Sequence, residues 1–126
     1  MKKIINTSKS PAPIGPYNQA ILKDNMLFIS GQIALDPNSM KLNNDSIEDE
    51  TNQVMLNIKH ILKEANMDFS NVVKTSIFLS DMNLFKEVND IYGKYIIKGD
   101  EPARETIAVK TLPMSVNVEI SMIAIV

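Results

Sequence analysis

Arg104 is the residue whose type and position most directly suggest a chemical role in this chain. It follows the turn-forming residues 98–102 and stands at the entry to the apolar segment 107–109. At the end of a strand it would hold a permanent positive charge, and its planar guanidinium matches a carboxylate through two parallel hydrogen bonds. The alternative is an ordinary surface arginine paired with a nearby acid such as Glu105. The local sequence leaves both open.

Glu119 is the second candidate, because a carboxylate flanked by apolar positions in a strand is costly unless it has a partner or a role. It shares a partly polar face with Asn117 and Ser121. A structural ion pair would explain it equally well. Arg104 and Thr106 share one face of the preceding strand by the two-residue period. If these two strands are neighbours, Arg104 and Glu119 border a common cleft.

Three weaker candidates lie earlier in the chain. Asn89 sits beside the apolar stripe of an expected helix, where an exposed or capping asparagine is the more ordinary interpretation. Tyr17 ends a loop with three prolines and is more simply a packing aromatic. The segment Ser30-Gly31-Gln32 ends a strand, but it lacks the G-x-S-x-G pattern of a nucleophile elbow.

Composition excludes several classes of function. The chain has 126 residues, a formal net charge of −2, one histidine and no cysteine. No basic cluster indicates nucleic-acid binding, and no segment approaches the ~20 apolar residues of a membrane span. A thiolate zinc site, a cysteine nucleophile and a Ser-His triad lack their residues. No phosphate-binding glycine loop is present, and no metal or organic cofactor is expected. The start of the chain lacks the apolar segment of a signal peptide, so we expect a cytoplasmic protein.

The elements that would position these residues begin with strands. Residues 3–5 predict a short strand, and residues 20–23 and 26–31 predict a β-hairpin around the turn pair Asp24-Asn25. A polar loop covers residues 36–45. Ser46 and Asp49 then form a start like a capping box, and apolar residues recur at helical spacing through residue 65.

The second half predicts a strand at 72–79, a helix at 82–97, and strands at 105–112 and 116–126 joined across Pro113–Ser115. The order is β-ββ-α-β-α-ββ. Two helices and one sheet pack most economically with both helices on one sheet face, an α+β fold. No linker or repeat interrupts the chain, which predicts one domain over residues 1–126.

The last strand predicts an oligomer. Val116, Val118, Ile120, Met122 and Ala124 share one face, which should meet the helices. The opposite face ends in Ile123 and Ile125 and is too apolar for water. A second buried face on one sheet indicates a partner, most simply another copy of the chain.

Seven segments together resemble the RidA family, also called YjgF, the reactive intermediate deaminases. They keep the family's order and spacing over essentially the whole chain: Ile14–Tyr17, Ile29–Ile33, Val72–Thr75, Val88–Asn89, Pro102–Arg104, Leu112–Pro113 and Val118–Ile120. The resemblance implies a chorismate-mutase-like α+β fold and a homotrimer with sites between subunits.

The resemblance also implies an activity. The arginine of the P-A-R segment marks the branch of imine deaminases, which hydrolyse 2-imino acids such as 2-iminobutanoate and 2-iminopropanoate to 2-oxoacids and ammonia. These imines, or their enamine tautomers, come from pyridoxal-phosphate enzymes, and their hydrolysis needs no cofactor. The family's site residues correspond here to Tyr17, Ser30, Gly31, Asn89, Arg104 and Glu119.

One position departs from the pattern, since Thr106 stands where some members have cysteine. This excludes a thiol but keeps a hydroxyl that could bind ligand or water. Arg104 would anchor the substrate carboxylate, and Glu119 would orient water and transfer its proton. The alternatives are a non-catalytic, regulatory binder of small carboxylates and, less favoured by the net charge, the endoribonuclease or translation inhibitor activity attached to some relatives.

Overall fold

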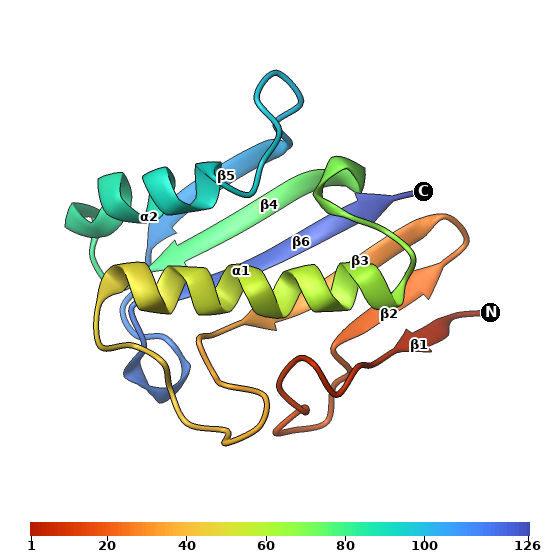
Figure 1. Ribbon diagram of the computed structural model, residues 1–126, viewed down its shortest axis with the longest axis horizontal. Coiled ribbons are helices and arrows are strands. Elements are labelled where there is room, and N and C mark those ends of the chain that lie inside the picture. The colour runs from red at the N-terminus through yellow and green to blue at the C-terminus, as the bar shows by residue number, and fades with distance from the viewer.

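The computed structural model describes residues 1–126 and shows one six-stranded mixed sheet with the strand order β1-β2-β3-β6-β4-β5. Both helices cross the same face of that sheet (Figure 1). The predicted order of elements and the α+β architecture are therefore confirmed. The elements are β1 (Lys3–Ile5), β2 (Ala20–Lys23), β3 (Met26–Gln32), α1 (Ile47–Glu64), β4 (Val72–Leu79), α2 (Phe85–Gly93), β5 (Ala103–Ala108) and β6 (Val118–Ile125).

The first half folds as its local signals predict. Asp24 takes a φ of 54°, the left-handed conformation that a tight turn between β2 and β3 requires. The Ser46 side chain accepts a hydrogen bond from the Asp49 N–H and starts α1. The apolar stripe of α1 is buried against the sheet. The packing of α1 thus follows from helical periodicity alone.

The second helix is shorter than the predicted 82–97. Residues Met82–Leu84 form a 3₁₀ turn, and α2 ends at Gly93. Beyond that point, Tyr95 packs edge-on against Phe69 with ring centroids 5.8 Å apart, and its hydroxyl donates to Asn52 Oδ1 of α1 at 2.9 Å. These tertiary contacts place residues 94–97 outside the helix. Neither helix is both long enough and apolar enough to cross a bilayer.

The last two strands are not neighbours, which corrects the condition on which Arg104 and Glu119 would have shared a cleft. β5 covers Ala103–Ala108 rather than 105–112 and pairs in parallel with β4, so β4 lies between β5 and β6. The connection from β4 to β5 runs through α2, and such a crossover places the returning strand parallel to the first. Helical crossover, not the short Pro113–Ser115 turn, therefore sets the neighbour of β5.

The two faces of the sheet differ in cover. On the helix side, Val118, Ile120, Met122 and Ala124 of β6 are all at least 98% buried, as their alternation predicts. The opposite face has no helix over it. The strand register lines up four apolar residues across β1, β2, β3 and β6 on that face: Ile4, Ile21, Phe28 and Ile123. This open face agrees with the observation that led us to predict an oligomer, which stays a prediction.

Candidate active site

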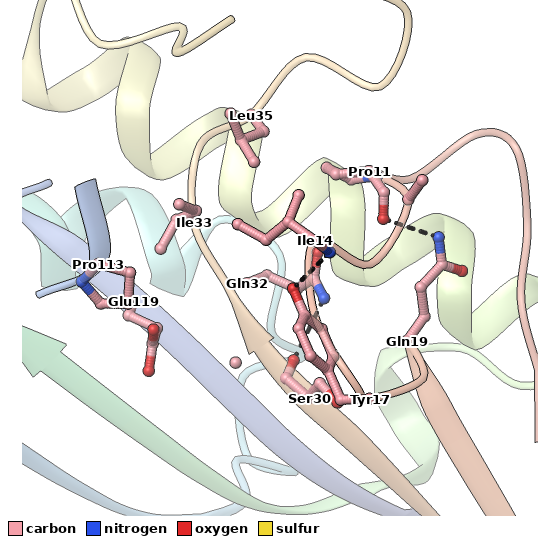
Figure 2. A pocket seen from close by; sticks show the side chains of 12 residues that line it. Pro11, Ile14, Tyr17, Gln19, Ser30, Gln32, Ile33, Leu35, Pro113 and Glu119 are labelled. Carbon is pink, nitrogen blue, oxygen red and sulfur yellow. Dashed lines mark hydrogen bonds between the residues drawn. The ribbon is translucent and has the colours of Figure 1, made fainter. Parts of the chain in front are cut away.

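A cavity of about 390 Å³ lies between the proline-rich loop and the ends of β3 and β6. Four of the predicted site residues line it: Gly31, and Tyr17, Ser30 and Glu119, which Figure 2 labels. The remaining lining is mostly apolar, with a few polar groups: Pro11, Ala12, Ile14, Gln19, Gln32, Ile33, Leu35 and Pro113. A small apolar pocket with a few convergent polar groups is the usual form of a ligand site.

Glu119 is the only charged side chain in this cavity. It is half-buried and packs against Gly31, where an added Cβ would stand 2.7 Å from Glu119 Oε2 and 2.8 Å from Cδ. Burial raises the pKa of the Glu119 carboxyl, with no charged or hydrogen-bonding partner to oppose the shift. A carboxyl that retains its proton to higher pH than usual, beside an open cavity, suits proton transfer.

The loop that forms one wall of the cavity is held by Gln19, a residue that the sequence did not single out. Gln19 is 98% buried, and its side-chain amide donates to the carbonyls of Thr7, Ser10 and Pro11 at 2.9–3.2 Å. Its Oε1 accepts from the Thr7 N–H at 2.7 Å. One buried side chain thus fixes a loop whose prolines cannot donate backbone hydrogen bonds themselves.

Tyr17 and Ser30 both line the wall of the cavity (Figure 2). The Tyr17 hydroxyl accepts from the Ile14 N–H at 3.3 Å, so this ring closes the proline-rich loop on itself. The Ser30 hydroxyl donates to the Asn18 carbonyl at 2.6 Å. With its proton committed to the backbone, Ser30 can accept a hydrogen bond from a ligand, which is a positioning role rather than that of a nucleophile.

Arg104 lies in a different hollow, of about 310 Å³, beside α2. Its Nη1 donates to Asn89 Oδ1 at 2.7 Å, and its guanidinium lies over the rings of Phe85 and Tyr92, with the carbon 5.7 and 5.2 Å from their centroids. Cation–π contacts of this kind hold a guanidinium without neutralising it. The alternative pairing with Glu105 is wrong, because Glu105 forms its ion pair with Lys74 at 2.8 Å.

The two rings that hold Arg104, Phe85 and Tyr92, belong to the apolar stripe of the second helix, and the sequence analysis did not single them out as site residues. Tyr92 is 95% buried and donates its hydroxyl to Thr75 Oγ1 at 3.0 Å. Burial raises the pKa of Tyr92, which keeps the phenol neutral. The pattern that could have indicated the two rings is a pair of aromatic residues at i and i+7 on one helix face, together with a single arginine in the chain.

Within one copy of the chain, Arg104 and Glu119 do not meet. Arg104 aligns with Thr75 and points to the helix side of the sheet, whereas Glu119 aligns with Phe78 on the open side. The predicted residues therefore form two groups, Asn89 with Arg104 and Tyr17, Ser30 and Gly31 with Glu119. Thr106 lines neither hollow, and its buried Oγ1 has no hydrogen-bond partner. No group of three or more metal-ligating side chains is close enough to hold a metal ion.

Comparison with known proteins identifies the family. The family model described as Endoribonuclease L-PSP matches residues 7–126. The chain belongs to the RidA (YjgF) family. Among curated RidA relatives, the 2-iminobutanoate/2-iminopropanoate deaminase of Mus musculus is 46% identical over 99% of this chain and 92% of its own length.

Solved structures of the RidA family agree. YyfA from Yersinia pestis, of the Conserved Rid Protein Family, is 41% identical with a TM-score of 0.96 over 100% of both chains. TdcF of Escherichia coli with bound serine is 30% identical with a TM-score of 0.92 over 98% of both chains. The fold implied by the sequence resemblance is therefore confirmed.

Proposed function

We propose that this RidA protein hydrolyses small 2-imino acids, with 2-iminobutanoate and 2-iminopropanoate as the reference substrates, to 2-oxoacids and ammonia. The reaction requires a group that moves a proton between water and nitrogen, and a cation for the substrate carboxylate. Glu119 and Arg104 have these two properties, and the printed name of the mouse relative is that of this activity. We place the reaction in the cytoplasm, where it would remove imines released by pyridoxal-phosphate enzymes.

The observation that carries the proposal is the state of Glu119. Its carboxyl is half-buried and unpaired, with a raised pKa, and it faces a cavity large enough for a small acid. Burying an unpaired carboxyl costs folding free energy, and such groups are found mainly where they have a function. A protein that only bound carboxylates would have no need of an acid there, which is why catalysis is favoured over binding.

The site would be assembled from two copies of the chain. One copy holds Arg104 and Glu119 on opposite faces of its sheet, separated by β4, so a substrate cannot touch both within that copy. The uncovered apolar face supplies a surface for association. We propose the homotrimer that the family resemblance implies, with Arg104 of one subunit facing the Glu119 cavity of the next.

In this arrangement Arg104 would bind the substrate carboxylate with two parallel hydrogen bonds, while Asn89, Phe85 and Tyr92 keep the guanidinium in one orientation. Fixing the carboxylate also fixes which face of the C=N bond is open to attack. Tyr17, Ser30 and the Gly31 backbone would form the wall against which the planar imine lies. Thr106 lies on the same face as Arg104, but its hydroxyl is buried outside both hollows, so the predicted contact with ligand or water is not part of this arrangement.

Glu119 would act as a proton shuttle. The ionised carboxylate takes a proton from water as the water oxygen bonds to C2 of the protonated imine, giving a tetrahedral carbinolamine. Glu119 then returns that proton to the amino nitrogen. The hydroxyl proton passes to the Glu119 carboxylate as the carbonyl forms and the C–N bond breaks, and its transfer to the departing ammonia releases ammonium and restores the carboxylate. Atoms and charges balance without a metal or a cofactor, because the substrate arrives activated.

The test is an assay in which a threonine dehydratase generates 2-iminobutanoate and semicarbazide traps what is not hydrolysed. We expect the wild-type protein to reduce trapping. We expect Arg104→Ala to lose at least about 100-fold of this activity, because it removes the anchor. Lys63→Ala, which deletes an exposed cation of α1, is the matched control and should retain full activity.

An inactive but folded wild-type protein would refute the deaminase proposal and favour the carboxylate binder, which a titration with 2-oxobutanoate would then test. The family description raises RNA cleavage as another candidate. The net charge of −2 argues against it, and we expect no RNA binding at low salt, where electrostatic association is strongest.

A further inference from the structure

We infer that Glu50 is a positioning residue for Glu119, acting through the backbone that leads into β6. This inference rests on the proposed function, in which Glu119 transfers the proton. Glu50 lies in the first turn of α1, where its sequence neighbours Glu48 and Asp49 are exposed and interact favourably with the helix N-terminus. Glu50 differs from both, because it is fully buried.

The Glu50 carboxylate accepts hydrogen bonds from the segment just before Glu119. Its Oε2 accepts hydrogen bonds from two consecutive backbone N–H groups, those of Asn117 at 2.8 Å and Val118 at 3.0 Å. Its Oε1 accepts from the Asn117 side-chain amide at 3.0 Å. No lysine or arginine pairs with Glu50, so its burial is compensated by these three donors and by the N-terminal end of α1.

Asn117 also connects the Glu50 carboxylate to the sheet. Its carbonyl accepts from the Ser80 N–H at 3.0 Å, and its Oδ1 accepts from the Ser80 hydroxyl at 2.9 Å. All the polar groups of Asn117 are therefore bonded, either to Glu50 in α1 or to Ser80 at the end of β4. The residue two positions before Glu119 is held from both sides.

Glu119 itself has no comparable restraint. Its carboxyl makes no hydrogen bond within the chain and touches Gly31, so its place in the cavity depends on where the backbone of β6 begins. A displacement near 1 Å at a reacting group can cost on the order of 100-fold in rate. Losing the Glu50 acceptor would release the two N–H groups that fix that backbone.

The test compares three replacements of Glu50 in the full-length protein. Glu50→Leu removes the acceptor at similar size, and we expect kcat to fall about tenfold or more while KM changes less than about threefold, since Arg104 still holds the substrate. Glu50→Gln keeps one oxygen for both backbone N–H groups, and the Asn117 amide can turn to face the new NH₂ group. We expect Glu50→Gln to keep kcat within about twofold of wild type. Glu50→Asp draws the oxygen back by one methylene and should lower kcat to an intermediate value.

A loss of stability alone must be separated from a loss of position. Leu62 is a fully buried residue near the other end of α1, and Leu62→Ala is the control. It should lower Tm while leaving the hydrogen bonds between Glu50 and residues 117–118 in place. We expect it to keep kcat at temperatures where it is folded. Amide hydrogen exchange at Asn117 and Val118 gives a readout independent of catalysis, and it should accelerate in Glu50→Leu and Glu50→Asp but not in Glu50→Gln or Leu62→Ala.

Wild-type kcat in a folded Glu50→Leu protein, or kcat lost equally in Leu62→Ala, would overturn the inference. If Glu50→Leu does not fold, Glu50→Asp decides by the same criteria. A wild-type protein without imine hydrolysis would instead refute the proposed function, whereas the exchange rates at the two amides would still report whether Glu50 fixes the start of β6.

Discussion

The two groups of proposed site residues, at the Arg104 end and at the Glu119 end of the site, are held in opposite ways. Arg104 lies on an edge strand whose residues are largely exposed, yet its guanidinium is held by Asn89 and by two aromatic rings. Glu119 lies in a strand whose alternate residues are fully buried, yet its carboxyl has no partner. The cation is exposed and fixed, whereas the acid is sheltered and free to exchange a proton.

In the proposed mechanism, this contrast corresponds to two different roles. A binding group works best when its orientation is fixed in advance, because less conformational entropy is lost on binding. A proton-transfer group needs both protonation states within reach, so a strong ion pair would hold it in one state. Side-chain environment, rather than residue type, separates the two roles, and substitutions at each end should therefore have different kinetic signatures.

Glu119→Gln should give the largest effect at the acid end. Without a titratable group, kcat should fall about 100-fold or more, which is the usual scale for a lost general acid–base. The affinity for 2-oxobutanoate, measured by calorimetry, should stay within about threefold, because Arg104 is intact. Arg104→Ala should instead abolish 2-oxobutanoate binding, because it removes the cation for the carboxylate. Equal loss of binding in both variants would remove the distinction between the Arg104 end and the Glu119 end.

Gly31→Ala should lower kcat about tenfold by moving Glu119 rather than by unfolding the protein. The new Cβ would stand 2.7 Å from Glu119 Oε2, the far end of a flexible side chain that can shift. A double-mutant cycle checks this, since Gly31→Ala should cost nothing further in a Glu119→Ala background. An undiminished tenfold loss in that background would show that Gly31 acts on something else.

Asn89→Ala should have a smaller effect, at the cation end. The rings of Phe85 and Tyr92 would still hold the guanidinium, but one hydrogen bond that orients its fork would be lost. We expect steady-state kinetics to show KM raised about three- to tenfold with kcat changed less, which is the scale of one ordinary net hydrogen bond. A pure kcat effect would place Asn89 in the proton-transfer step instead.

The smallest effect should be on stability and should depend on pH. Because burial raises the pKa of Glu119 in the folded state, ionisation is easier in the unfolded chain, and stability falls as pH rises from the unfolded pKa through the folded pKa. Glu119→Gln removes this cost. Its Tm should exceed that of wild type by a few degrees at neutral pH and match it below the unfolded pKa, as followed by thermal melts across pH. A gain that is the same at all pH values would contradict the assignment.

Local patterns were enough to predict most of the fold. The N-cap at Ser46, the stripe of α1, the turn at Asp24 and the alternation of β6 all depend on neighbouring residues. The position of β4 between β5 and β6 depends on pairing between segments far apart in the sequence, which no local pattern records. The same limit applies to the end of α2, which is set by contacts of Tyr95 with α1 and Phe69.

The site divides in the same way. Residue types and the family resemblance indicated the candidates, but not that they form two groups on opposite faces of the sheet. The groups that hold the candidates were missed, since Gln19 and Glu50 act through backbone atoms of distant segments. One signal was available for Glu50: it precedes Val54 and Ile58 at intervals of four residues, so it stands in line with the apolar stripe of α1.

The central claim is that each site takes Arg104 from one subunit and Glu119 from another. The most direct test is to unfold Arg104→Ala and Glu119→Gln proteins together, refold the mixture and assay it for imine hydrolysis. Some mixed interfaces would then carry an intact Arg104 opposite an intact Glu119, and random pairing predicts recovery of roughly a quarter of wild-type activity. Activity no higher than that of either variant refolded alone, with mixed oligomers present, would contradict the account.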